Sequence, residues 1–407
     1  MQYSKEEIIQ YIQEEDIKFI HLAFCNVFGK QKNISIMADE LEKAFTYGIA
    51  IDASAIAGFG DESRSDLLLH PETDTLTILP WRPEHGRIVR MFCSISYPDG
   101  TPFPCDTRNL LKKAVKKAEK AGVQFFFGPE MEFYLFELDP HGQPTKVPYD
   151  TAEYMDIAPE DKCENIRREI CLTLEQMGIF PESAHHEEGP GQNEIDFRYS
   201  DPLTSADNTL TFQAIVKTIA QRNGLYADFS PKPLSNYPGN GFHINISAKD
   251  KANNDLTPQI IASILQHIAE MTIFLNPTPG SYMRFGMHKA PRYITWSKEN
   301  RSQLIRIPAA IDNHRRVELR SPDSTTNPYL AFTLLIDTVL EGIEKQFPLP
   351  PSTDLNLFTA DAESLIHFKR LPQTIEEAAL IAANSSFLAA NLPEKIIQTY
   401  RQLSKEG

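Results

Sequence analysis

Two glutamates interrupt a strongly apolar segment in the first third of the sequence. Glu130 and Glu132 lie in VQFFFGPEMEFYLFEL, residues 123–138. Residues two apart on a β-strand share one face, so both carboxylates project together among aromatic residues that favour burial. Neighbouring buried carboxylates repel each other and lose hydration unless a cation lies between them. The pair therefore predicts a metal site; the alternative is a solvated edge strand with one acidic face.

A second acidic segment, HHEEGPGQNEIDFRY, spans residues 185–199 and carries Glu187 and Glu194. The GPG sequence between them predicts a tight reversal that brings the two carboxylates back toward one point. His185 and His186 are also candidate ligands, but consecutive residues on a strand face opposite ways. At most one of them joins the cluster, and a structural or capping role is equally open.

A polar strand face is expected in GNGFHINIS, residues 239–247, where His243, Asn245 and Ser247 alternate. The glycines at the start of this segment allow a ligand to approach the backbone closely. His243 is either a ligand or a core histidine with its hydrogen bonds satisfied, and the alternation leaves both interpretations open.

Arginines gather in two later segments, NRSQLIRIP and RRVELRSPD. The first carries Arg301 and Arg306, and the second carries Arg316, Glu318 and Arg320 on one strand face. A carboxylate between two guanidinium groups is either an ion-pair ladder or part of a phosphate site, because the guanidinium fork matches phosphate oxygens.

Together these side chains predict phosphoryl-transfer chemistry. Hard oxygen ligands with little sulfur favour Mg²⁺ or Mn²⁺, and two such cations with an arginine clamp can transfer a phosphoryl group. The sequence holds no Walker A, G-x-G-x-x-G, kinase HRD or HExxH motif. Bound ATP is therefore expected to be held by metals and arginines rather than by a glycine-rich loop.

The elements that position these residues fall into two parts. The first part is expected to be a small α+β unit that starts with a helix, because Ser4 and Glu7 form a capping-box pattern. Strands are expected there over 19–27, 34–37, 76–79 and 87–96, with a helix over 39–47. The proline-rich segment YPDGTPFPCDT marks the boundary, which we place between domains 1–103 and 104–407.

The second part alternates helical and strand-like patterns and carries the polar residues on its strands. Helices are expected over 108–121, 162–177, 208–222 and 258–274, after 327–328, and through the last 50 residues. Strands are expected over 123–136, 193–199, 241–246, 304–307 and 315–320.

Composition narrows the partners. The chain has 407 residues, 41% hydrophobic and 23% charged, and its net charge is 40 − 55 = −15. Such an acidic protein repels nucleic acid and anionic membranes, although local arginines and metals still permit a nucleotide. The five cysteines form no CxxC pair, and the acidic N-terminus is unlike a signal peptide. We expect a cytoplasmic protein with no nucleic-acid or membrane partner.

Taken in order, the motifs resemble those of the glutamine synthetase family along nearly the whole chain. They are IDASAIAGF, GPEMEF, HHEEGPGQNEIDF, NGFHINIS, NPTPGSYMR, APRYITWSKENRSQLIRIP and RRVELRSPDSTTNPYLAF. The resemblance implies an α+β protein with an N-terminal β-grasp domain. It also implies a catalytic domain whose antiparallel strands form a funnel flanked by helices, in hexameric or dodecameric rings.

The resemblance also implies two groups of metal ligands. One metal would be held by Glu132, Glu187 and Glu194, and the other by Glu130, His243 and Glu318. The implied cofactors are two or three Mg²⁺ or Mn²⁺ ions, with ATP as a substrate.

Further roles follow from the same resemblance. Arg284, Arg320 and the Gly239 backbone would bind the amino-acid carboxylate, and Arg301, Arg306 and Arg316 would neutralise the transferring phosphoryl group. Tyr199 would stack on adenine, with Tyr154, Asn245 and Ser247 lining the nucleotide site. Asp52 would reach a neighbouring subunit's active site, which makes Asp52, Arg301 and Arg320 the implied catalytic set.

The implied reaction joins glutamate to a nitrogen nucleophile through an acyl phosphate, giving a γ-glutamyl amide. The acceptor would be ammonia or, in preference, another small amine; the alternative is a catalytically silent member with an assembly or regulatory role. This sequence departs from the family pattern at Lys289, where a glutamate of the ammonium site is usual, and at Ala55, Asn245, Pro238 and Phe358.

Lys289 carries most weight among these departures. A lysine would repel NH₄⁺ by roughly 4 kcal/mol at about 4 Å in an effective dielectric near 20. Lys289 could pair with Asp52, bind an acceptor that carries a carboxylate, or point to solvent while a nearby acid replaces the lost glutamate.

Overall fold

The computed structural model describes residues 3–60, 62–81, 86–309 and 315–405. The chain divides into two compact units, Met1–Lys112 with Gln176–Gly178, and Lys113–Glu175 with Ile179–Gly407. These units divide after Lys112, nine residues after the domain boundary expected from the sequence. The boundary after residue 103 stays a prediction.

The first unit begins with α1 (Lys5–Glu14), and its predicted capping box is confirmed. The Glu7 N–H donates to Ser4 Oγ at 3.1 Å, and the Ser4 N–H donates to the Glu7 carboxylate at 2.7 Å. Ile8 and Ile12 form the buried face of this helix. The amphipathic pattern and the cap therefore agree on where the helix starts.

The sheet of the first unit is mixed. Its strand order is β2 (Gln31–Met37), β1 (Phe19–Cys25), β6 (Ile88–Ser96), β4 (Asp66–Pro71) and β3 (Ile49–Asp52), with β5 (Thr77–Ile78) also paired to β6. β1 and β6 run parallel, whereas the other pairs are antiparallel. Its other helices are α2 (Leu41–Tyr47) and the 3₁₀ turns η1 (Ala38–Glu40), η2 (Ala53–Ala55), η3 (Glu62–Arg64) and η4 (Thr73–Thr75).

The second unit is built on a larger sheet in which β7 (Val123–Leu138) is the longest strand. The order is β13 (Trp296–Lys298), β14 (Ile305–Ile307), β15 (Val317–Leu319), β12 (Phe242–Asp250), β7, β10 (Gln192–Phe197) and β9 (Pro181–His186). β8 (Pro144–Pro148) and β11 (Leu225–Asp228) also pair with β7. The predicted antiparallel arrangement holds except between β13 and β14, which run parallel.

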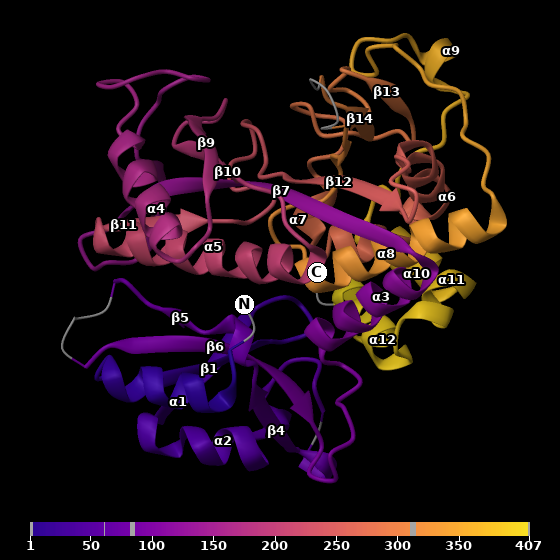
Figure 1. Cartoon of the computed structure of the whole chain (residues 1–407). Helices are drawn as coiled ribbons and strands as arrows, with labels where there is room; N and C mark the ends of the chain where they lie inside the picture. Colours follow the sequence, from indigo (N-terminus) through magenta and orange to yellow (C-terminus); the bar gives the residue numbers. More distant parts are fainter. Residues whose placement is uncertain (1–2, 61, 82–85, 310–314, 406–407) are drawn as a thin grey trace. The chain divides into compact units, whose positions relative to one another are not determined.

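Helices cover this sheet (Figure 1). The long ones are α4 (Glu164–Gln176), α5 (Pro202–Arg222), α6 (Thr257–Leu275) and α8 (Pro328–Lys345), and α3 (Thr107–Ala121) leads into β7. Shorter ones are α7 (Pro279–Tyr282), α9 (Ala362–Leu365), α10 (Ile375–Ala383), α11 (Ser386–Asn391), α12 (Glu394–Gln402) and η5 (Leu403–Lys405). α5 packs on β7 and β11, and α6 packs on β12 and α8. The helices thus fix the strands that carry the polar side chains.

α5 starts six residues before the predicted position, because the Asp201 carboxylate accepts from the N–H groups of Leu203 and Thr204 and Pro202 fits the first turn. α6 is long and apolar enough to cross a membrane by length and composition, but 67% of its apolar window is buried inside the fold. That burial is what the core helix of a folded domain shows.

Candidate active site

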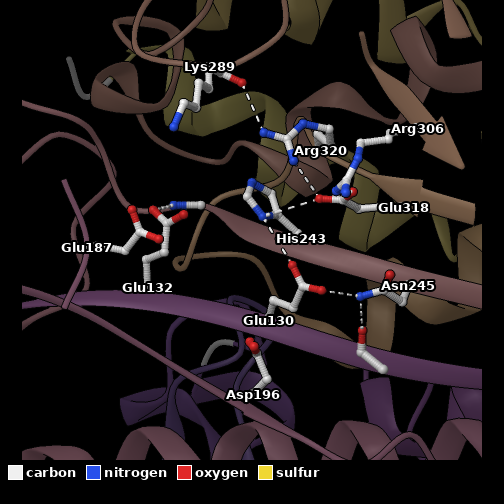
Figure 2. A network of polar contacts seen from close by, with 12 residues as sticks. Glu130, Glu132, Glu187, Asp196, His243, Asn245, Lys289, Arg306, Glu318 and Arg320 are labelled. Atoms are coloured by element: carbon white, nitrogen blue, oxygen red, sulfur yellow. Dashed lines mark hydrogen bonds and ion pairs between the residues drawn. The ribbon is translucent and has the colours of Figure 1, made fainter. Parts of the chain in front are cut away.

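Strand register brings the predicted acidic residues together. Glu130 of β7 lies opposite His243 of β12, and Glu132 lies opposite Glu194 of β10. Directly opposed residues on antiparallel strands have neighbouring side chains on one face. Alternation along β7 therefore points both glutamates toward the same region (Figure 2).

Glu130, His243 and Glu318 form one candidate metal group. Their ligand atoms all lie within 4.8 Å of one another. His243 Nδ1 is 3.5 Å from Glu130 Oε2 and 3.7 Å from Glu318 Oε1. The structure thus places together the residues that the family resemblance assigns to one metal, and carboxylate oxygens with an imidazole nitrogen suit a divalent cation.

The second implied trio, Glu132, Glu187 and Glu194, is less compact than the first. Glu194 is the shared member, since its ligand atoms group with those of Glu132 and His243 and, separately, with those of His185 and Glu187. Asp196 also lies within such a group, together with Glu130 and Glu194. Our sequence analysis missed Asp196, although it follows Glu194 by two residues and therefore shares its strand face.

The predicted reversal between Glu187 and Glu194 is confirmed as the β9–β10 hairpin. The Glu187 N–H donates to the Gln192 carbonyl at 2.8 Å, and Gly191 turns the chain at φ +68°. His185 Nε2 lies 2.9 Å from Glu187 Oε1, whereas His186 is buried against Asp150 on the other face. Only one of the two histidines therefore joins the cluster, as strand alternation predicts.

Burial makes it energetically unfavourable for the clustered glutamates to be ionised together unless a cation is bound. It raises the pKa of Glu194 well above its ordinary value and also raises the pKa of Glu132. Burial acts on Glu187 in the same direction, but hydrogen bonds from His185 and the Glu188 N–H outweigh it and lower the pKa of Glu187. A bound cation would offset the repulsion and the lost hydration, so these residues fit a divalent metal.

Arginines surround Glu318, although not in the predicted order. Arg320 Nη1 lies 2.5 Å from Glu318 Oε1. Arg306, which lies on the neighbouring strand β14, pairs with the other carboxylate oxygen of Glu318, Oε2. Arg316 does not complete this ion pair; its Nε donates to Asn245 Oδ1 at 2.9 Å. Burial raises the pKa of Glu318, but Arg320, His243 and Arg306 together hold the pKa well below its usual range.

Several arginine nitrogens suit an anionic ligand. The Nε atoms of Arg284, Arg306 and Arg320 are buried, and within the described ranges they have no hydrogen-bond partner. Arg284 also packs against Gly239, where an added Cβ would come within 2.2 Å of the Pro231 carbonyl oxygen and 2.7 Å of Arg284 Cγ. Glycine is therefore required at this approach of backbone to side chain.

These side chains line a pocket of about 460 Å³. Its residues include the metal candidates Glu130, Glu132, Glu187, Glu194 and His243, the predicted substrate residues Gly239, Arg284, Arg301, Arg306, Arg316 and Arg320, and also Tyr154, Glu188 and Lys289. Tyr154 was assigned to the nucleotide by resemblance, but its ring lies here, 5.4 Å from the His185 ring and edge-on to it.

A neighbouring pocket of about 830 Å³ shares Glu130, Asp196 and Arg316 with the first. Tyr199, Asn245 and Ser247 line it, as expected for residues of one nucleotide site. Tyr199 is 56% exposed and meets the Phe126 ring edge-on at 5.8 Å. The free face of such a tyrosine can stack on a planar base.

Asp52 is placed differently from the other candidates. It belongs to the first unit and, within the described ranges, lines neither pocket. Its Oδ1 accepts from the Ser54 N–H at 2.9 Å and from Ser54 Oγ at 2.7 Å, which lowers its pKa.

Comparison with known proteins identifies the family. The glutamine synthetase beta-Grasp domain matches residues 16–98, and the glutamine synthetase catalytic domain matches residues 104–406. A glutamine synthetase from Clostridium saccharobutylicum is 43% identical, covering 92% of this chain and 88% of the relative. One from Methanosarcina mazei is 42% identical, covering 98% and 92%.

Solved structures agree with these matches. A structure described as "GmaS/ADP complex-Conformation 1" is 26% identical, with a TM-score of 0.88 over 98% of this chain and 94% of that one. A Plasmodium falciparum glutamine synthetase shares the fold with a TM-score of 0.86 at 22% identity, over 100% and 96%. The β-grasp domain and the catalytic domain expected from the sequence are confirmed. The chain therefore belongs to the glutamine synthetase family and is an ATP-dependent C–N ligase.

Proposed function

We propose that the enzyme forms a γ-glutamyl amide from glutamate and ATP through an acyl phosphate. The acceptor is ammonia or, in preference, another small amine. The observation that carries the proposal is one pocket in which clustered carboxylates face buried arginines whose Nε atoms have no partner among the residues that the structure describes. Such a site can hold cations and anions side by side, as phosphoryl transfer requires.

The family uses divalent metals and ATP, and the donor set here suits two or three Mg²⁺ or Mn²⁺ ions. Glu130, His243 and Glu318 would hold one ion. The family resemblance assigns Glu132, Glu187 and Glu194 to another, with Glu194 close to each of the other two. When bound, such ions neutralise ATP phosphates and the transferring group.

The nucleotide would occupy the larger pocket. Tyr199 offers a stacking face for adenine, with Asn245 and Ser247 beside it and Arg316 at the junction with the acidic pocket. The similar GmaS structure is a complex with ADP, which supports an adenine nucleotide here. Tyr154 lies among the glutamates instead, which favours a role near the acceptor rather than near the base.

Glutamate would lie in the smaller pocket, with its α-carboxylate toward Arg284, Arg320 and the Gly239 backbone. Its γ-carboxylate oxygen attacks the terminal phosphorus of ATP, and ADP leaves. Arg301 and Arg306 stabilise charge on the transferring phosphoryl group. The amine nitrogen then bonds to the acyl carbon, phosphate leaves, and the nitrogen loses a proton to a pocket carboxylate.

The family forms oligomeric rings, and we propose a hexameric or dodecameric ring in the cytoplasm for this chain. Asp52 would then complete the active site of a neighbouring subunit.

The test measures ADP release with glutamate, Mg²⁺ or Mn²⁺, and a panel of amines that includes ammonium, with the product identified by mass spectrometry. We expect glutamate-dependent ADP release and a γ-glutamyl amide. Metal binding without ADP release for every amine would favour a silent family member. Glutamine formation from ammonium as the fastest reaction would assign the activity in the names of the relatives.

A further inference from the structure

The turn that carries Lys289 has an unusual backbone. His288 and Lys289 adopt positive φ angles of 45° and 65°, which non-glycine residues rarely adopt. The turn is closed by a hydrogen bond from the Ala290 N–H to the Met287 carbonyl at 2.9 Å. Arg320 Nη2 donates to the Lys289 carbonyl at 3.3 Å. Strained residues persist where their surroundings fix them, so the position of Lys289 is tied to an active-site arginine.

The Lys289 side chain lies on the acidic pocket. Figure 2 shows it extending toward the side where Glu187 and Glu132 lie. Its Nζ pairs with Glu188 and lies 5.6 Å from the centre of the Tyr154 ring. The side chains of Lys289 and Glu188 are 46% and 33% exposed, and ion pairs at that exposure contribute little stability. A ligand with suitable charges can therefore replace either partner.

The positive charge of Lys289 beside the negative charge of Glu188 favours an acceptor that carries both charges itself. A cationic amine alone would meet repulsion from Lys289 and would gain nothing from it. An acceptor with both an ammonium and a carboxylate would insert into the Lys289–Glu188 pair and satisfy both partners. The face of the Tyr154 ring, 5.6 Å from Lys289 Nζ, offers the ammonium a further attractive contact at this position.

Resting on the proposed function, we infer that the acceptor is an amino acid whose carboxylate pairs with Lys289 and whose amine faces Glu188. The amine nitrogen bonds to the γ-acyl carbon, the bond from that carbon to the phosphate oxygen breaks, and phosphate leaves. The ammonium nitrogen gives up two protons in all, one to a pocket carboxylate before it attacks and one that leaves with the phosphate. The product is a γ-glutamyl dipeptide, formed with one ADP and one phosphate.

The experiment compares acceptors that differ only by the carboxylate. Each common amino acid, with β-alanine and 4-aminobutyrate, is tested against its decarboxylated amine and against ammonium, with ADP release and product mass as readouts. We expect the preferred amino acid to exceed its decarboxylated partner in kcat/KM by about tenfold or more, as one charge-assisted contact allows. Lys289→Gln should remove that ratio while decarboxylated amines are still used, and Lys289→Arg should keep it.

Lys146→Gln is the matched control. Lys146 pairs with Asp228 at 2.6 Å and lies 5.1 Å from the Phe136 ring, but within the described ranges it lines neither pocket. It should leave the ratio unchanged. Equal use of amino acids and their decarboxylated amines, or a ratio that survives in Lys289→Gln, would overturn the inference while leaving the ligase activity standing. Absence of ADP release with every acceptor would overturn the proposed function and the inference with it.

Discussion

Glu318 and Glu130 belong to one candidate metal group, but their surroundings differ. The Glu318 side chain is 1% exposed and pairs with Arg306 and Arg320. The Glu130 side chain is 22% exposed and accepts from Asn245 Nδ2 at 2.7 Å. Loss of charge at Glu318 leaves buried guanidinium groups without a counter-ion, whereas loss at Glu130 relieves repulsion among carboxylates.

The same substitution should therefore have different effects on folding. Glu318→Gln should lower the free energy of unfolding by about 3–5 kcal/mol, and Glu130→Gln should change it by less than about 1 kcal/mol. Both should weaken Mn²⁺ binding by more than about tenfold, since each removes a ligand. Urea denaturation and calorimetry measure the two effects. Equal stabilities, or unchanged Mn²⁺ binding in Glu130→Gln, would contradict the assigned group.

Proton release should accompany metal binding. Burial raises the pKa of Glu194 and of Glu132, which favours their protonated forms, whereas a metal binds the ionised carboxylates. Mn²⁺ affinity should therefore fall as the pH is lowered toward these raised pKa values and rise as the pH increases. Calorimetry at one pH in buffers of different ionisation enthalpy measures the protons released. Glu194→Gln should reduce the release, and identical heats in all buffers would contradict it.

Local sequence patterns predicted some of the residue contacts in the site and missed others. Alternation along β7 was enough to pair Glu130 with Glu132, and the GPG reversal to pair Glu187 with Glu194, but the register of β10 against β7 brings the two pairs together. The pairing of Arg306 with Glu318 was missed, because it depends on the register of β14 against β15. The Lys289–Glu188 pair joins residues 101 positions apart, a separation that no local pattern reports.

At the scale of elements, hydrogen bonds to the buried Asp150 carboxylate fix the position of the β9–β10 hairpin. The Asp150 carboxylate accepts from His186 Nε2 at 2.9 Å, from the Gly191 N–H at 2.9 Å and from Cys163 Sγ at 3.2 Å. His186 Nδ1 in turn lies 2.7 Å from the Glu187 carbonyl. This one buried carboxylate thus holds the end of β9 and the turn of the hairpin that presents Glu187.

Asp150→Asn should loosen the hairpin, because the amide can serve fewer of these donors. We expect Mn²⁺ affinity to fall by about 10–100-fold, as for the loss of other groups that orient metal ligands. Asp228→Asn is the control, since Asp228 is buried and paired with Lys146 but lies outside both pockets. The control should lose stability without losing Mn²⁺ affinity. Similar affinities in both variants would argue against a positioning role.

In the same hairpin, only one of the two strands could be predicted from the sequence. β10 overlaps the strand predicted over 193–199, whereas no strand was predicted over the PESAHH sequence of β9. It is a strand because it pairs with β10, and this pairing depends on tertiary structure. The long elements β7 and α6 were predicted well, since each carries a strong pattern of its own over many residues.

At the scale of the whole molecule, the position of Asp52 bears on assembly. Asp52 is exposed, caps the short turn η2 and lies outside the pockets of the second unit. The family forms rings, in which a residue of one subunit can complete the site of the next. Our proposal that Asp52 does so makes each active site dependent on two chains.

Mixed rings test this dependence. Asp52→Ala and Glu130→Gln subunits should each assemble into inactive rings, because every site lacks either Asp52 or a metal ligand. When the two are dissociated, mixed in equal amounts and reassembled, about a quarter of sites should combine an intact Glu130 with an intact Asp52 from the neighbour, provided subunits associate at random. Activity should then recover to about that fraction of the wild-type value. Native mass spectrometry verifies that both subunits share rings, and rings of either variant reassembled alone control for the treatment. If mixed rings form but stay inactive, Asp52 acts within its own chain.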